Sequence, residues 1–567
     1  MTVPTERETP KIEHDGVGHK IMQGGEPFVL PPELSAMGNI DLRSNGGVLV
    51  NSGGKPEFFV RPPFWRAKKY DPMVRQEDVK PLYGRRELSD QELGTNSLDV
   101  GGELELLFWN REEKEVYRVM TGDSPVIQKL IDHNNGLRFH QETDVFSAWP
   151  DKIAFSPEFI ASVCELNFPH APNSLERGIQ QLRVLQIVDE AANDNGALIV
   201  PISAFSHRPL LPGDTHPHPY IERVAFEYMG WERVKHFVGN SWQVHVEMLT
   251  LDSALAAINY LQQITPIIHS LTLASPFIDG KIFLSDQNLP GLGIEPSTWQ
   301  SVRYLARYVG SPSGGVIRQP FPEKENDFWV MAAEMLASGE IPSPARTGGH
   351  HVDFRIRPDL PPYGTIEITF MDTAGACPLK LLALQEFLRV VCWKLQRIVI
   401  ENNRGELPNL FFGDLTPERL LQLHNASIAV SKDGMKSSMT AGDGFSYPVE
   451  TLWRKLVEWI DSPKPDWEYH GLSPGVIMEL NKSSTQVTHE DLKPFENREG
   501  IPSVYGYYRT GLGTLSQWLL ARAERLIRAG ESEFEAIVNC LGDLGSSYHH
   551  WLHHLTPNDI KQLLCYP

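Results

Sequence analysis

Residues 352–370 read VDFRIRPDLPPYGTIEITF, two alternating runs on either side of the turn-like segment DLPPYG. Side chains alternate across a strand, so residues two positions apart share a face. The pattern therefore predicts an antiparallel hairpin. Its apolar face comprises Phe354, Ile356, Ile366, Ile368 and Phe370. Its polar face carries Asp353, Arg355, Arg357, Thr365, Glu367 and Thr369.

Two further runs alternate in the same way. In GGELELLFW, residues 101–109, Glu103 and Glu105 share one face, opposite leucine and phenylalanine side chains. In QVHVEM, residues 243–248, Gln243 and His245 share a face with Glu247. If these strands join the hairpin in one sheet, its polar face gathers carboxylates, a glutamine, a histidine and two arginines, but no lysine.

Each of these strands taken alone fits an ordinary sheet with one solvated face. Taken together they fit a site better, because carboxylates with Gln and His are typical of metal sites that prefer oxygen ligands. Arginine beside them suits bidentate capture of carboxylate or phosphate. Such a set could bind a nucleoside triphosphate with Mg²⁺. The chain contains no GxxxxGK[ST] motif and no GxGxxG after a predicted strand, so ATP would bind through another architecture.

The chain divides into three parts by composition. Residues 1–95 are rich in Gly, Pro and charge, which predicts an irregular N-terminal extension. Residues 96–440 mix short alternating runs with helical stretches, which predicts an α+β domain that contains all three polar strands. Residues 441–567 have mainly helical spacing and are expected to form a helical C-terminal module. At 567 residues, the chain is long enough for such an arrangement.

The overall charge excludes some partners. Lys and Arg total 52 against 72 Asp and Glu, a net charge of -20, so nonspecific binding to nucleic acid or anionic lipid is not expected. The five cysteines occur singly, which favours a reducing cytoplasm over a disulfide framework. The most apolar stretch, residues 379–400, is interrupted by charges and predicts an amphipathic helix rather than a membrane span. The sequence leaves open whether the protein is a homo-oligomer.

An ordered series of motifs resembles glutamate-cysteine ligase family 2, the ATP-dependent carboxylate-amine ligases. GGELE (101–105) resembles the opening GxExE strand of that family, and CELN (164–167) a following strand that presents a glutamate. QVHV (243–246) resembles its QVHV strand, ASPFIDG (274–280) its NSPFxxG turn, and SVR (301–303) its SxR element. RIRPDLPPYGTIEITFMDT (355–373) resembles its most specific signature, RLRPxxGTIEIRxxDT.

The resemblance implies a fold and a site. The fold would be α+β, with a curved, mostly antiparallel sheet like that of glutamine synthetase and helices on its outer face. The residues implied to ligate or surround Mg²⁺ are Glu103, Glu105, Glu165, His245 and Glu367. Those implied to contact the nucleotide are Gln243, His245 and Arg357, while Arg303, Arg355 and Arg357 would hold phosphate or the substrate carboxylate.

The reaction implied is amide formation from two small molecules. ATP phosphorylates a carboxylate, here the γ-carboxylate of glutamate, and an amine, here that of cysteine, attacks the acyl phosphate. Three departures from the family pattern concern the substrates: Thr369 stands in place of an arginine, Ala274 in place of an asparagine, and SIAVSKDGM (427–435) has fewer arginines than the family motif. Two alternatives therefore remain, a specialised amide ligase for another amino acid, peptide or amine, and a catalytically silent nucleotide-binding regulatory subunit.

Other signals are assigned structural roles. HHWLHH, residues 549–554, has His pairs at i and i+4 that could bind a metal on a helix, but no neighbouring carboxylate or cysteine completes a site in the sequence. His216 and His218 are expected in a loop, and His350 and His351 are structural or lie at a substrate rim. Cys164 is expected to be a packing residue, because the proposed chemistry needs no thiol.

Overall fold

The computed structural model describes short strands within residues 11–60 and most of the chain from residue 98 onward. Apart from single positions inside them, the later described ranges are 98–119, 124–133, 138–140, 145–148, 153–158, 160–215, 240–282, 300–301, 321–331, 354–357, 364–462 and 471–564. No helix in these ranges combines the length and the apolar character that a membrane crossing requires.

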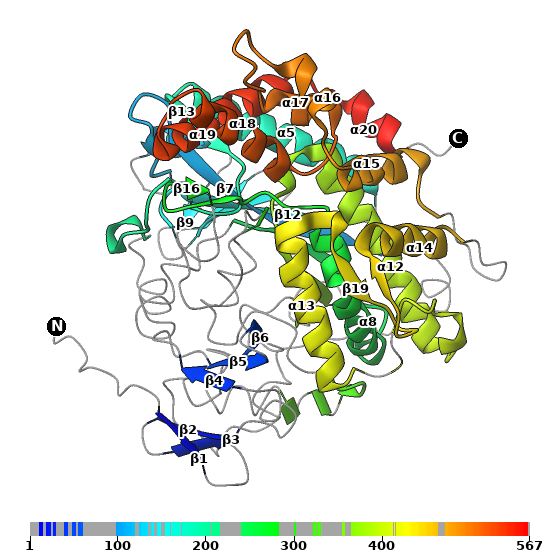
Figure 1. Ribbon diagram of the computed structural model, residues 1–567. Coiled ribbons are helices and arrows are strands. Elements are labelled where there is room, and N and C mark those ends of the chain that lie inside the picture. Colours follow the sequence, from blue (N-terminus) through cyan, green and yellow to red (C-terminus); the bar gives the residue numbers. More distant parts are fainter. Residues whose placement is uncertain are drawn as a thin grey trace.

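A ten-stranded sheet lies at the centre of the described structure, and all its neighbouring strands are antiparallel (Figure 1). Its main path runs β17-β18-β14-β7-β12-β11-β10-β9, and β8 and β13 also pair with β7. The strands are β7 (Val100–Asn110), β8 (Glu115–Val116), β9 (Arg138–His140), β10 (Val145–Ala148), β11 (Ile153–Pro157), β12 (Val163–Ala171), β13 (Ala197–Val200), β14 (Trp242–Glu247), β17 (Phe354–Arg357) and β18 (Thr365–Met371). The α+β class with a mostly antiparallel sheet is confirmed.

The hairpin predicted from residues 352–370 is present as β17 and β18. Phe354 pairs with Ile368, and the next position pairs Arg355 with Glu367, so apolar and polar pairs alternate along the hairpin. Strand β18 then pairs with β14, and β14 with β7. The three stretches singled out in the sequence are therefore neighbours in one sheet.

Twelve helices are described. They are α4 (Pro125–His133), α5 (Ser174–Asn193), α8 (Leu251–His269), α12 (Pro378–Ile400), α13 (Pro417–Asp433), α14 (Val449–Asp461), α15 (Pro474–Ser484), α16 (His489–Leu492), α17 (Tyr505–Thr510), α18 (Leu515–Arg528), α19 (Glu533–Leu552) and α20 (Pro557–Leu564). Two short hairpins, β15 (Phe277–Ile278) with β16 (Lys281–Ile282) and β19 (Ser438–Thr440) with β20 (Ser446–Pro448), and several short 3₁₀ helices are also described after residue 98. The helices that follow residue 448 confirm the helical character predicted for the C-terminal part.

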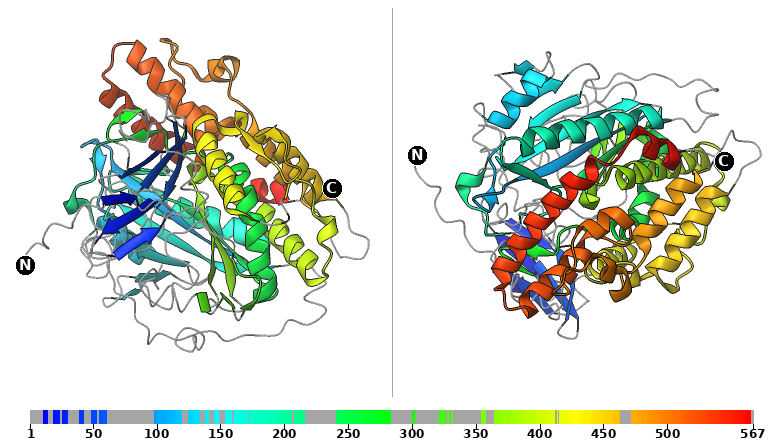
Figure 2. Two further views of the ribbon diagram at one scale, coloured as in Figure 1. Left: turned by 60° about the horizontal axis from the view of Figure 1, so that its bottom comes forward. Right: turned by 90° about the horizontal axis from the view of Figure 1, so that it is seen from above.

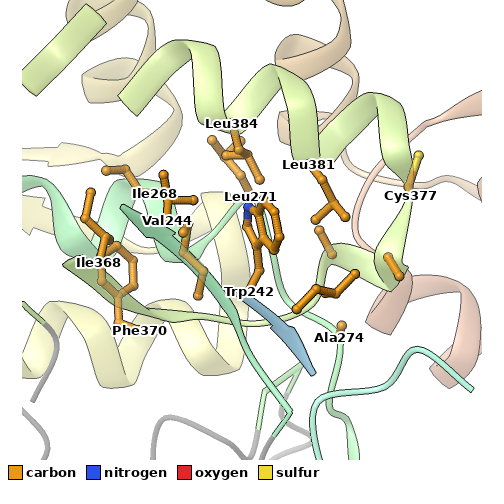
Figure 3. Close-up of a cluster of buried hydrophobic side chains, with 14 of the residues drawn as sticks. Trp242, Val244, Ile268, Leu271, Ala274, Ile368, Phe370, Cys377, Leu381 and Leu384 are labelled. Carbon is orange, nitrogen blue, oxygen red and sulfur yellow. The ribbon is translucent and has the colours of Figure 1, made fainter. Parts of the chain in front are cut away.

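Helices α8 and α12 cover the apolar face of the hairpin and of β14. In Figure 3, Val244 of β14 and Ile368 of β18 lie among Ile268 of α8 and Leu384 of α12, and all four side chains are fully buried. A capping box in which Thr250 and Ser253 bond reciprocally fixes the start of α8. Burial of apolar side chains stabilises by roughly 1.5–3 kcal/mol each, so this layer anchors the sheet and leaves its polar face on the other side.

Helix α12 differs from its prediction. It was expected to be amphipathic, but the structure buries nearly every side of it, charged residues included. Lys394 donates to the carbonyl oxygens of Trp459, Ile460 and Ser462 at the end of α14. Glu386 forms ion pairs with Arg389 and with Arg177 of α5. Two of the charges that suggested a solvated face, Glu386 and Lys394, thus have partners from distant parts of the chain.

The turn between β18 and α12 is held from the C-terminal helices. Gly375 adopts φ of 66°, which costs glycine little and other residues more. The hydroxyl groups of Tyr507 and Tyr508 donate to the carbonyl oxygens of Ala374 and Gly375 at 2.7 and 3.0 Å. The C-terminal helices thus fix the point where the hairpin enters α12, and Figure 2 shows them gathered beside that helix.

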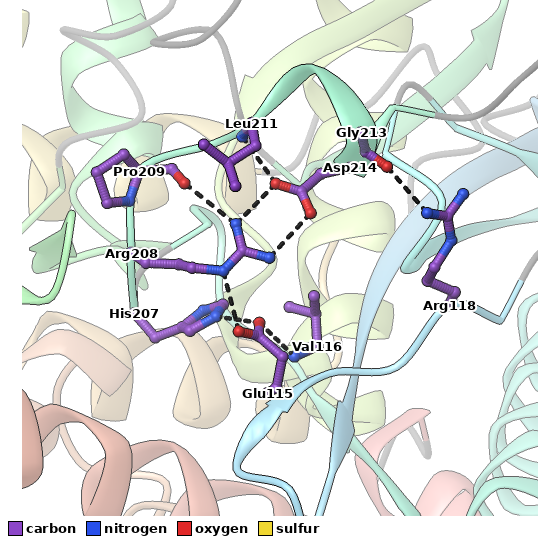
Figure 4. A network of polar contacts seen from close by, with 9 residues as sticks. All are labelled: Glu115, Val116, Arg118, His207, Arg208, Pro209, Leu211, Gly213 and Asp214. Carbon is purple, nitrogen blue, oxygen red and sulfur yellow. Dashed lines mark hydrogen bonds and ion pairs between the residues drawn. The ribbon is translucent and has the colours of Figure 1, made fainter.

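A polar network ties the β7–β8 turn to the segment after β13 (Figure 4). Arg208 forms a bidentate contact with Asp214 at 2.7 and 2.9 Å and also donates to Glu115 at 3.0 Å. Burial by itself would raise the pKa of Asp214 and of Glu115, but the hydrogen bonds from Arg208 hold both below their ordinary values. The network is part of the scaffold and lies outside the predicted site.

The N-terminal segment contains more regular structure than predicted. Six strands form two three-stranded antiparallel sheets, β1-β2-β3 and β4-β5-β6. They are β1 (Lys11–His14), β2 (His19–Gln23), β3 (Glu26–Val29), β4 (Asn39–Leu42), β5 (Val48–Ser52) and β6 (Lys55–Val60). Each strand has only four to six residues, and the sequence between the strands is rich in Gly and Pro, so these residues dominated the sequence pattern.

Candidate active site

The polar face of the sheet brings together the side chains predicted from the strand pattern. Strand register places Gln243 opposite Glu103 and His245 opposite Glu367. On the other side of β7, Glu105 lies opposite Glu165 of β12. Alternation along each strand thus directs residues from β7, β12, β14 and β18 to one face, as the sequence predicted.

The first cluster contains Glu103, His245 and Glu367. Their ligand atoms lie within 4.8 Å of one another. Nε2 of His245 is 3.2 Å from Oε1 of Glu103, and Nδ1 of the same ring is 3.3 Å from the Thr365 hydroxyl. His245 and Glu367 are buried, while Glu103 is partly open to solvent.

Two arginines of the hairpin contact the same carboxylate. Arg355 forms a bidentate ion pair with Glu367, and Nη1 of Arg357 lies 3.2 Å from Oε2 of Glu367. The Arg355 side chain is 7% exposed and that of Arg357 is 16% exposed. Glu367 therefore orients both guanidinium groups, and Arg357 is the more accessible of the two.

The charges around this cluster favour ionised carboxylates. Burial by itself would raise the pKa of Glu367, but Arg355 and His245 hold it well below its usual range. Burial would likewise raise the pKa of Glu103, and there His245 outweighs it, so the pKa is lowered. Burial, reinforced by His245, lowers the pKa of neighbouring His170 to about 4. Its ring meets that of His245 edge-on at 5.8 Å, a contact that no sequence motif indicated.

The second cluster consists of carboxylates alone. Glu105, Glu158 and Glu165 place one oxygen each within 4.8 Å of the others. Glu105 accepts hydrogen bonds from the backbone N–H and hydroxyl of Ser241 and from Gln243, at 2.7, 2.8 and 2.9 Å. Glu158, just after β11, was missed by the sequence analysis, because it belongs to no motif and depends on the pairing of β11 with β12.

The two clusters differ in the ions that they suit. Mg²⁺ prefers oxygen ligands and usually takes one or two carboxylates together with substrate phosphates. The all-carboxylate cluster of Glu105, Glu158 and Glu165 fits this preference directly. In the first cluster, Glu103 can supply an oxygen, but His245 adds a nitrogen and Glu367 is engaged by two arginines. The chemistry of the donors thus fits Mg²⁺, with the better match at the second cluster.

A buried contact joins the SPF turn to the end of the hairpin. Oδ2 of Asp372 accepts from the backbone N–H of Ala274 at 2.8 Å and from the Ser275 hydroxyl at 2.9 Å. The Ser275 hydroxyl lies 3.0 Å from that of Ser301. Three motifs that are far apart in the sequence therefore meet, and Asp372 is a positioning residue that the sequence analysis did not single out.

Some predictions fall outside the described residues. Arg303 is one of them, as are Asp353, His216, His218, His350 and His351. Cys164 is buried, and burial raises the pKa of its thiol, which confirms its assignment to packing. The four cysteines in the described part of the chain are all buried and free.

Comparison with known families confirms the resemblance drawn from the motifs. A model of glutamate-cysteine ligase family 2 matches residues 216–398, about a third of the chain. The match includes β14 and the β17–β18 hairpin, and hence His245 and Glu367. No match is found among curated protein sequences.

Three solved structures show weak similarity. The bifunctional glutathione synthetase from Pasteurella multocida is 12% identical with a TM-score of 0.48, over 86% of this chain and 54% of that one. This chain thus spans about half the length of that protein. Glutamate–cysteine ligase from Francisella tularensis, in complex with AMP, is 10% identical with a TM-score of 0.44, over 82% and 97% of the two chains. The ligase PafA, in complex with the ubiquitin-like protein Pup, is 12% identical with a TM-score of 0.39, over 77% and 70%.

Proposed function

We propose that the protein is an ATP- and Mg²⁺-dependent carboxylate-amine ligase. The observation that carries this proposal is the meeting of two carboxylate clusters and two arginines on one face of the sheet. Negative charges held this close repel one another, so the arrangement suits residues that bind cations. The match of residues 216–398 to glutamate-cysteine ligase family 2 supports the same conclusion.

The reaction proceeds in two steps. An oxygen of the substrate carboxylate attacks the γ-phosphorus of ATP, and the bond to ADP breaks. The amine nitrogen then attacks the acyl carbon, phosphate leaves with the former carboxylate oxygen, and the amine loses a proton. Mg²⁺, when bound, would offset the charge of the phosphate oxygens.

The residues have distinct proposed roles. Glu105 and Glu165, with Glu158, would hold one Mg²⁺, while Glu103 would take part in a second site beside His245. Arg357 is accessible enough to contact phosphate or the substrate carboxylate, and Glu367 holds its guanidinium in place. Arg355 is nearly buried against Glu367 and supports that geometry. Gln243 orients Glu105 through its 2.9 Å hydrogen bond. Arg303 is proposed as a further phosphate ligand from the motif alone.

For the substrates, we propose the γ-carboxylate of glutamate and the amine of cysteine, on the basis of the family. The free, buried cysteines suit a reducing cytoplasm, where cysteine is available as a thiol. A specialised amide ligase is the second candidate, favoured by Thr369. This residue follows Glu367 on the polar face of β18, where the family pattern has an arginine. A threonine there removes one positive charge, which changes the substrates that the site can bind.

The test is ADP release from Mg²⁺-ATP and glutamate across a panel of amino acids and amines, with mass spectrometry of the product. Turnover that depends on cysteine and yields γ-glutamylcysteine supports the namesake reaction, whereas turnover with another amine supports the specialised ligase. Glu103→Gln should abolish either turnover. Glu112→Gln, an exposed change in the β7–β8 turn, is the matched control and should leave it unchanged. Silence across the panel would favour the regulatory-subunit alternative.

A further inference from the structure

The HHWLHH run forms a cluster that its sequence neighbours do not reveal. His549 lies in the last turn of α19 and His553 is the C-cap residue of that helix, and both face Asp189 of α5. Nδ1 of His549 is 2.5 Å and Nε2 of His553 is 3.0 Å from Oδ2 of Asp189. The sequence around the histidine pair shows no carboxylate, because this carboxylate comes from a helix 360 residues earlier in the chain.

The carboxylate of Asp189 is placed as a metal ligand would be. Its side chain is fully buried, whereas those of His549 and His553 are 32% and 26% exposed, so solvent can reach the cluster from one side. Oδ1 of Asp189 has no hydrogen-bond partner in the described part of the chain. A buried carboxylate with an unused oxygen is costly unless a further partner satisfies it.

The surroundings of the histidines support the same interpretation. The second ring nitrogen of His553, Nδ1, is 3.6 Å from Oε1 of Glu190. Histidines that bind metals almost always direct their other nitrogen to a carboxylate, a carbonyl oxygen or water. The amide of Gln186 on α5 donates to the carbonyl oxygens of Leu552 and Leu555, at 3.0 and 3.2 Å, and so holds the two segments in register. Residues around the three side chains, Glu190 and Gln186, therefore help to fix the orientation of His553 and the position of the two helices.

We propose that Asp189, His549 and His553 bind a Zn²⁺ ion that joins α5 to the C-terminal helix α19. Two imidazole nitrogens and one carboxylate oxygen suit Zn²⁺ better than Mg²⁺. The three ligand atoms lie within 4.8 Å of one another. In tetrahedral Zn²⁺ sites the ligand atoms are about 3.3 Å apart, so small side-chain rotations suffice to admit the ion. Water takes the fourth position on the exposed side.

This site is separate from the candidate active site and does not depend on the proposed ligase activity. None of its residues lies on β7, β12, β14 or β18, whose side chains form the two clusters described above. Viewed from above, α19 crosses over α5 (Figure 2). The ion would thus fasten the last long helix of the chain to the helix that follows β12.

The chain provides its own matched control. His550 and His554 are also one turn apart on the same helical segment, with ring centroids 4.4 Å apart, but both are exposed, and no carboxylate partner is seen for either among the described residues. The double variant His550→Gln/His554→Gln removes as many imidazoles as a double change at the proposed site. It separates a specific site from general affinity of a histidine-rich surface for metal.

The experiment measures Zn²⁺ bound by the full-length protein after EDTA treatment and re-addition of Zn²⁺ with excess Mg²⁺, which occupies oxygen-rich sites. We expect wild type and the His550→Gln/His554→Gln control to retain one more Zn²⁺ per chain than His549→Gln or His553→Gln. Glu190→Gln should weaken Zn²⁺ binding by about tenfold or more. With Mg²⁺ kept in excess, removal of Zn²⁺ should lower the melting temperature of wild type but not of His553→Gln. Equal Zn²⁺ uptake by wild type and His553→Gln, or equal loss in the control, overturns the proposal.

Discussion

Replacement of Glu367 by glutamine should separate two roles of the carboxylate cluster. Both oxygens of Glu367 face arginines, and its side chain is fully buried. Glutamine keeps one acceptor oxygen, but it places an NH₂ group where a guanidinium already donates. Removing one partner of a buried ion pair costs about 3–5 kcal/mol, because the other charge remains buried.

Glu103→Gln provides the comparison. The Glu103 side chain is 19% exposed and its described ion-pair partner is the single residue His245, at 3.2 Å. Glutamine keeps an acceptor oxygen for this contact and removes a charge that repels Glu367, so the change costs at most about 1 kcal/mol. Glu367→Gln should therefore be less stable than Glu103→Gln by at least about 2 kcal/mol. This difference corresponds to about 4–8 °C in melting temperature if roughly 150–250 residues unfold together. Neither variant should release ADP above background, because each loses a charge of the proposed metal-binding clusters.

The assay is thermal unfolding of wild type, both single variants and Arg355→Gln/Glu367→Gln, paired with ADP release. The double variant removes both charges and should recover part of the stability lost in Glu367→Gln. If Glu367→Gln melts at the wild-type temperature, or if the double variant is no more stable than Glu367→Gln, the buried ion pair between Arg355 and Glu367 does not have the assigned strength. Normal ADP release by Glu103→Gln would refute its place in the site.

Three further changes test other parts of the structure. Arg357→Lys should reduce ADP release or raise the KM for substrate, because lysine cannot reproduce a bidentate fork, and unchanged kinetics would place Arg357 outside the site. Gly375→Ala should lower the stability of the fold by about 1 kcal/mol or more, because φ of this residue is 66° and a Cβ would lie 2.9 Å from the Tyr507 ring. Gly405→Ala, where a Cβ would meet nothing within 4 Å, is the control. Equal melting temperatures of the two variants would contradict the role assigned to Gly375. Arg208→Gln should destabilise the protein at neutral pH. The pKa values of Asp214 and Glu115 are lowered in the folded protein, so their ion pairs with Arg208 contribute fully to stability above the ordinary pKa values of 3.8 and 4.5. This stabilisation is lost as the pH falls through the lowered pKa values of the folded protein. The difference in melting temperature from wild type should therefore shrink below about pH 4, and a difference that grows on acidification would contradict the assignment.

The sequence was sufficient to predict those parts of the fold that a local pattern of residues determines. The hairpin of β17 and β18 could be predicted in register because its two strands alternate and a short turn connects them. The shared face of Glu103, His245 and Glu367 followed from the same period, once the three strands were assigned to one sheet. These residues depend on alternation, which is a property of the strand itself.

Contacts between remote segments could not be predicted in this way. Glu158 reaches Glu105 and Glu165 through the pairing of three strands, and Asp189 reaches His549 across most of the chain. The charges of α12 suggested a solvated face, because their partners on α5 and α14 leave no periodic signal in the sequence. Where partners are far apart in the chain, only the folded structure brings them together.

The most direct test of the proposed ligase activity follows the oxygen atom through the reaction. With a carboxylate substrate labelled with ¹⁸O, glutamate first, an acyl phosphate route transfers one labelled oxygen to inorganic phosphate as the amide forms and ADP is released. We predict ¹⁸O in the phosphate for wild type and no turnover for Glu103→Gln. Amide formation with unlabelled phosphate, or with the label in AMP, would contradict phosphoryl transfer to the carboxylate.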